Sequence, residues 1–158
     1  MSATFPPPVA APERNRPAPA LAAGALTAIV SALAYGALLR VLAHGNGSTT
    51  ELGYGPVVAG ALVGIAVGKA GGRNVLLPFA ATLLTVLAVL FGGLLGTALI
   101  ESHLVSRAGG TLSPGDLFFH HFGALWKTWQ HDFGMQRFIG LLLGSSAAYG
   151  MARRFGDR

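Results

Sequence analysis

Four apolar stretches, separated by shorter polar ones, account for most of the chain. They lie at about residues 20–43, 55–70, 75–100 and 136–152. At about 1.5 Å per residue, helices over the first and third would exceed the roughly 30 Å hydrocarbon core of a bilayer. No charged residue lies in the middle of any stretch, although charged groups at that depth usually mark proton pumps and ion pathways. The pattern therefore predicts four membrane-spanning helices.

Glycines recur every fourth residue inside two of these stretches. Residues four apart lie on one face of a helix, and each interior glycine costs a helix in water about 1 kcal/mol against alanine. In a bilayer the same stripe lets a second helix approach closely. The residues predicted to pack helices together are Gly60, Gly64, Gly68, Gly140 and Gly144. Weaker stripes occupy the first and third stretches: Gly24, Ala28, Ala32 and Gly36, and Ala88, Gly92 and Gly96.

A different pattern follows Ser113-Pro114-Gly115-Asp116, which is typical of a helix start. Over about residues 115–133, one side of a helical wheel carries Phe118, Phe119, Phe122, Leu125, Trp126, Trp129 and Phe133. The opposite side carries Asp116, His120, Lys127 and His131. An aromatic face opposite a polar face predicts an amphipathic helix lying in the membrane interface, with Phe118, Phe122, Trp126 and Trp129 as its interfacial residues. The alternative is a helix that covers the bundle without contacting lipid.

The ends of the chain have no such pattern. Residues 1–19 contain six prolines and no apolar periodicity, which predicts a disordered tail, and residues 155–158 form a second short tail. Residues 20–154 then make one membrane domain. The predicted fold is all-α: a four-helix transmembrane bundle with Gly/Ala-xxx-Gly/Ala packing faces and one interfacial amphipathic helix.

Composition supports this class and excludes others. The 158 residues are 52% hydrophobic and only 11% charged, whereas soluble domains average about 25% charged residues. The net charge is +5, but the basic residues lie singly at the ends of apolar stretches, which suits anionic lipid headgroups and argues against nucleic acid. The absence of cysteine excludes disulfides and cysteine nucleophiles.

The basic residues also predict the orientation. With four crossings, both termini and the turn after residue 70 lie on one side, which carries seven basic and two acidic residues. The other side carries four of each. Because cytoplasmic segments are enriched in Lys and Arg, both termini are predicted to be cytoplasmic. The basic residues of that side are Arg14, Arg16, Lys69, Arg73, Arg153, Arg154 and Arg158.

No residue pattern predicts catalysis. Gly64 to Lys69 superficially resembles a phosphate-binding loop, but it has three residues between the glycines instead of four and Ala70 where serine or threonine belongs. His120 and His131 would lie about 16 Å apart along a helix, too far to share a metal. We therefore expect no enzyme activity, no catalytic residues, no cofactor and no metal site.

Residues 55–91, a glycine-rich stretch ending in GKAGGRN before a leucine- and valine-rich one, resemble small uncharacterised bacterial multi-pass proteins. The resemblance implies a bacterial inner-membrane protein with four crossings, and it transfers no functional residues. The partners expected are the lipid bilayer and either a second copy or another membrane protein. The function expected is that of a non-enzymatic scaffold or accessory subunit acting through close helix packing. The alternative is a transporter or channel for ions or small solutes, alone or as an oligomer.

Overall fold

The computed structural model describes residues 16–42, 54–72, 74–111, 113–131 and 134–157. Within these residues the chain is all-helical, with six helices and no strand, which confirms the predicted all-α class. The first fifteen residues of the predicted tail and Phe133 of the predicted aromatic face lie outside the described residues. The helices are α1 (Pro17–Leu42), α2 (Gly55–Gly71), α3 (Leu77–Arg107), α4 (Pro114–His120), α5 (Phe122–His131) and α6 (Met135–Gly156).

The helices differ from the predicted ones at four places. α6 continues to Gly156, four residues past its predicted end and into the predicted tail at residues 155–158, and the backbone N–H of Asp157 still donates to the carbonyl of Arg153. α1 begins at Pro17, inside the predicted tail, because proline in a first turn lacks only an N–H that would have no helical partner. α3 continues past Glu101 to Arg107 and ends just before Gly109, whose φ of 85° a helix cannot contain. In place of one helix over about residues 115–133, two helices meet at His121.

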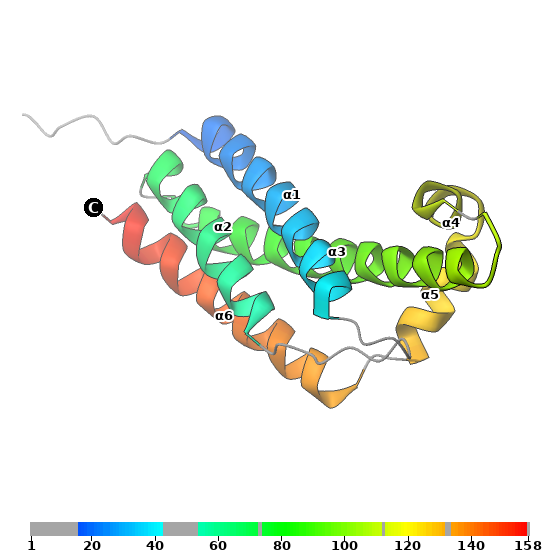
Figure 1. The fold of residues 1–158 in the computed structure, drawn as a ribbon. Helices are drawn as coiled ribbons and strands as arrows, with labels where there is room; N and C mark the ends of the chain where they lie inside the picture. The colour runs from blue at the N-terminus through cyan, green and yellow to red at the C-terminus, as the bar shows by residue number, and fades with distance from the viewer. Residues whose placement is uncertain (1–15, 43–53, 73, 112, 132–133, 158) are drawn as a thin grey trace, which may run out of the picture.

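Four of the helices, α1, α2, α3 and α6, pack together along most of their lengths (Figure 1). Small residues at successive turns of α1 meet successive turns of α3, so these two helices run parallel. The same holds for α2 and α6, and this pair runs opposite to the first. α2 and α3 also contact each other, whereas the described parts of α1 and α6 do not. Each helix therefore packs most extensively against a helix that is not its neighbour in sequence.

Small side chains dominate the interior of these four helices. The main buried cluster consists of Ala20, Ala28, Val63, Val67, Leu77, Ala81, Ala88, Ala148 and Ala152. The large apolar side chains lie mostly on the outside, among them Leu26 and Leu83, each more than 60% exposed. α1 and α3 are long and apolar enough to cross a membrane, and α2 is apolar but shorter. These two helices indicate association with a membrane.

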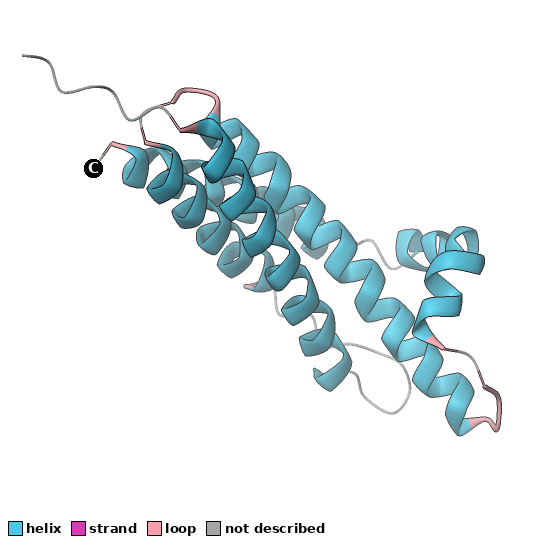
Figure 2. Cartoon of the chain, turned by 90° about the horizontal axis from the view of Figure 1, so that it is seen from above, coloured by secondary structure: helices cyan, strands magenta, loops and turns pink. Residues whose placement is uncertain are grey.

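The last two turns of α3 extend beyond the bundle, and α4 and α5 fold back against the same half of α3 (Figures 1 and 2). A second buried cluster joins them, made of Leu94, Ala98, Leu117, Leu125 and Trp129. Apart from their contact with each other, α4 and α5 pack only on α3 among the described helices. Their position on the molecule therefore depends on that one cluster.

Candidate helix-packing and interfacial sites

The contact between α2 and α6 brings four of the five predicted packing glycines to one seam. A β-carbon built on Gly60 would overlap the carbonyl oxygen of Gly144, and one on Gly64 would overlap that of Ala148. A β-carbon on Gly68 would lie 2.7 Å from the carbonyl oxygen of Ala152. Backbone thus meets backbone over three successive turns, which only residues without side chains permit. Below we call this contact the α2–α6 seam.

Gly144 contacts α2 both through its carbonyl group, against Gly60, and at the position where a side chain would begin. A β-carbon on Gly144 would lie 2.5 Å from the carbonyl oxygen of Pro56, at the start of α2. Gly140, one turn earlier in α6, is also buried. The predicted stripe therefore faces the interior along its whole length.

A comparable seam joins α1 to α3, although its glycines were not among the predicted packing residues. A β-carbon on Gly36 would lie 3.0 Å from the carbonyl oxygen of Gly92, and one on Gly92 would lie 2.9 Å from that of Ala32. A β-carbon on Gly96 would meet the side chain of Leu39 at 2.8 Å. The signal in the sequence was the same four-residue spacing, present in both stretches but interrupted by alanine.

Other glycines make room for aromatic rings. The ring of Tyr35 lies between Gly92 and Gly55, where added β-carbons would approach it to 3.0 and 2.6 Å. The indole nitrogen of Trp129 would lie 2.8 Å from a β-carbon on Gly93. No spacing rule identifies Gly55 or Gly93, because each is defined by a ring that arrives from another helix.

The predicted interfacial residues divide into a buried and an exposed group. Trp129 is 7% exposed and packs on α3, whereas Phe118 and Trp126 are half-buried beside it. Phe122 is 44% exposed. The centre of its ring lies 6.4 Å from the ring centre of Trp126, and that of Trp126 lies 5.1 Å from the ring centre of Trp129, so the three rings form a stack. Phe119, which the aromatic wheel also included, is 83% exposed. One edge of the aromatic face thus attaches the hairpin of α4 and α5 to α3, and the other is left for lipid or another surface.

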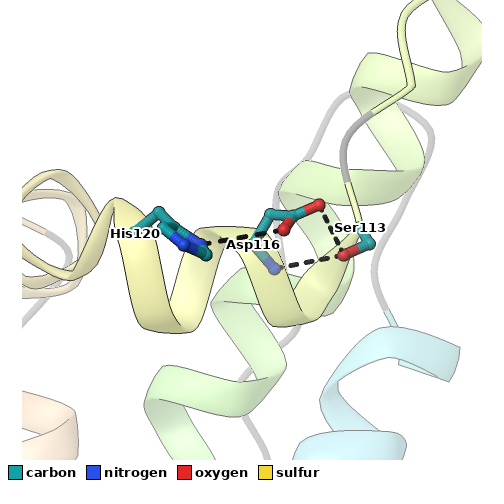
Figure 3. Close-up of polar contacts among 3 residues, drawn as sticks. All are labelled: Ser113, Asp116 and His120. Atoms are coloured by element: carbon teal, nitrogen blue, oxygen red, sulfur yellow. Dashed lines mark hydrogen bonds and ion pairs between the residues drawn. The ribbon is translucent and has the colours of Figure 1, made fainter.

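The polar side of α4 begins with a helix cap (Figure 3). The hydroxyl of Ser113 accepts a hydrogen bond from the backbone N–H of Asp116 at 3.1 Å and donates one to its carboxylate at 2.8 Å. His120 lies 3.7 Å from the same carboxylate, with both side chains largely exposed. The cap explains why Ser113 starts a helix. In the part of the chain described here, no three His, Asp or Glu side chains group closely enough to hold a metal ion.

Several hydroxyl groups inside the bundle are satisfied by their own helix. Thr85, which is fully buried, donates to the carbonyl of Ala81 at 2.9 Å, and Thr27 and Thr97 donate in the same way to residues four positions earlier. The hydroxyl of Ser145 is buried with no hydrogen-bond partner. These threonines bring polar atoms into an apolar interior at little cost, because the hydrogen bond is made locally.

The exposed edge of the aromatic face leads to a first prediction. Phe119→Asp should weaken contact of the α4–α5 hairpin with lipid, since burying a phenylalanine side chain in an apolar layer is worth about 1.5–3 kcal/mol. Quenching of the two tryptophans by lipids carrying a nitroxide near the headgroup should fall. Lys127→Asp, on the polar side of α5, is the control and should leave the quenching unchanged. Equal quenching in Phe119→Asp and the unsubstituted chain would mean that this edge does not contact lipid.

No protein-family model matches the chain, and neither a curated protein nor a solved structure matches it. Its function is therefore inferred from packing and surface alone.

Proposed function

We propose that this chain is a multi-pass protein of a bacterial inner membrane, with α1, α2, α3 and α6 as its four crossings and both termini in the cytoplasm. In this proposal it acts as a non-enzymatic scaffold or accessory subunit, and the close packing of its small residues is what it contributes. The observation that carries the proposal is the distribution of side-chain size: glycine and alanine dominate the space between the helices, and the large leucine, isoleucine and phenylalanine side chains lie mostly outside.

This distribution favours lipid over water as the surroundings. A water-soluble helical protein buries its large aliphatic side chains, because each stabilises the fold by about 1.5–3 kcal/mol when removed from water. Here Leu26, Ile29, Leu33, Leu83 and Leu142 are all more than half exposed. In hydrocarbon their exposure has no such cost, and helices associate instead through close contact of small residues.

The number of basic residues in the sequence supports cytoplasmic termini, since seven lie on the side of the termini and four on the other. The beginning of α1 and the ends of α2 and α6 lie at the same end of the bundle (Figure 1). Arg16, Lys69, Arg153 and Arg154 all belong to these segments. Lys69 lies 5.6 Å from the centre of the Phe155 ring, which joins the cationic ends of α2 and α6. Lys and Arg close to helix ends mark the cytoplasmic side of a membrane protein.

The interior favours a packing role over a pore. A cavity between the helices, lined by residues that include Tyr35, Pro56, Gly93, Trp129 and Arg137, has a volume of only about 20 Å³. That is roughly the space of one water molecule. A solute pathway through this part of the bundle would require the helices around the cavity to move apart.

The test of this proposal has two arms. First, the chain should remain with membranes after an alkaline carbonate wash, and reporters fused before α1, between α2 and α3, and after α6 should all report from the cytoplasm. Second, liposomes containing the purified chain should pass ions and small solutes no faster than empty liposomes. Release of the chain by carbonate, or termini on opposite sides, would contradict the membrane topology. Solute passage above the leak of empty liposomes would instead favour a transporter or channel.

A further inference from the structure

An apolar groove of about 530 Å³ runs between α1, α3 and α4. α4 packs on α3 but not on α1, so the groove is the space that separates α4 from α1. Alanines of α1 and α3, Ala28, Ala32 and Ala88, form part of its lining, and larger side chains such as Leu33, Phe91 and Phe118 line the rest.

Small residues keep the groove open. The alanines on α1 and α3 leave only a methyl group each on the wall of the groove. On α4, a β-carbon built on Gly115 would meet only the hydroxyl oxygen of Ser113, at 3.6 Å. The groove is therefore a consequence of residue size along three helices.

The shape and chemistry of the groove select its occupant. Its lining extends from Leu84 to Leu95 on α3, which is about 16 Å along the helix axis. The side chains that line it are all aliphatic or aromatic, so nothing in it would orient a polar ligand. The groove is long and wholly apolar, which suits an extended hydrocarbon chain.

We propose that this groove binds one acyl chain of a membrane phospholipid. The proposal rests on the function proposed above, because the groove is bounded by α1 and α3, the two helices long and apolar enough to lie across the hydrocarbon layer. In that layer phospholipid chains are the abundant molecules of this shape. The acyl chain occupies the space between α4 and α1 and thereby braces a hairpin whose backbone lies close to α3 alone among the described bundle helices.

The experiment uses the purified full chain in detergent and a phosphatidylethanolamine with a diazirine on one acyl chain. The lipid is added at one molecule per protein and activated by light, and the labelled peptides are identified by mass spectrometry. Peptides that cover residues 25–33 and 84–95 should be labelled several times more strongly than residues 138–143, the exposed outer face of α6. An excess of the unlabelled lipid should abolish this preference.

Two matched variants locate the site. Gly115→Phe should lower labelling of the groove about tenfold, because the ring would occupy the volume that the chain needs. Gly123→Phe, on α5, should leave labelling unchanged, since no atom lies within 4 Å of its added β-carbon. If Gly115→Phe proves unstable, the preference of the unsubstituted chain for the groove peptides remains the deciding measurement.

The outcomes separate the two proposals. Equal labelling of the groove and the outer face of α6, in a chain that stays with carbonate-washed membranes, would overturn the acyl-chain site and leave the proposed function standing. Labelling of the groove that no unlabelled lipid displaces would also overturn it. Release of the chain from membranes by carbonate would overturn both.

Discussion

Gly60→Leu is expected to separate α2 from α6 and to lower the free energy of unfolding by about 3 kcal/mol or more. A β-carbon at this position alone would overlap the carbonyl oxygen of Gly144. A clash with backbone cannot be relieved by rotating a side chain, so the helices must move apart and lose the contacts of neighbouring turns. Unfolding of the purified chain by denaturant in detergent measures the loss.

Two alanine substitutions test the same contact, because they should change the stability of the chain in opposite directions. Gly→Ala in a helix that has room for the methyl group normally stabilises it by up to about 1 kcal/mol. Gly150, on the outer side of α6, has no atom within 4 Å of its added β-carbon, so Gly150→Ala should raise stability. Gly60→Ala should lower it. A rise in both variants would show that α2 and α6 do not make this contact.

Trp129→Ala should release the α4–α5 hairpin from α3, at a cost of about 3–5 kcal/mol to the stability of that attachment. Trp129 is the largest side chain of the cluster that holds the hairpin, and its indole nitrogen lies against Gly93. Hydrogen exchange should show lost protection in α4 and α5. The four bundle helices should keep most of theirs, since the backbones of α4 and α5 lie close to no described bundle helix other than α3 and Trp129 reaches the rest only at a small cavity that Tyr35, Pro56 and Arg137 also line.

The control for this variant is Phe119→Ala. Phe119 is 83% exposed, so its truncation should change protection of the hairpin by less than about 0.5 kcal/mol. If Trp129→Ala instead lowered protection throughout α1, α2 and α6, the hairpin would be part of one cooperative unit with the bundle. If it changed nothing, the second buried cluster would not hold the hairpin.

The four-residue spacing of glycines predicted which faces are small, and the structure supplies their partners. Gly60 could have faced any other helix, because periodicity defines a face and carries no information on what packs there. That it meets Gly144 depends on the register between two helices far apart in the sequence. Rings that cross between helices, such as Tyr35 of α1 between Gly55 of α2 and Gly92 of α3, are likewise contacts that periodicity does not predict.

The hairpin was the least predictable element. The aromatic wheel over about residues 115–133 is continuous, so the sequence predicted one straight helix. Leu117 and Leu125 instead belong to a single buried cluster on α3, and the chain bends at His121 between them. The same packing divides the aromatic face into side chains that are buried against α3, such as Trp129, and side chains that stay exposed, such as Phe119. Tertiary contacts, which a wheel does not contain, decide this division.

The parallel pairing of α2 with α6 has a consequence for biosynthesis. The ribosome completes α2 long before α6 exists, so the glycine face of α2 has no partner until α6 has been made. α1 faces the same delay until α3 has been made. The α2–α6 seam, the most extensive contact among the described helices, can therefore form only at the end of synthesis, and a chain that terminates before α6 would leave the glycine face of α2 uncovered.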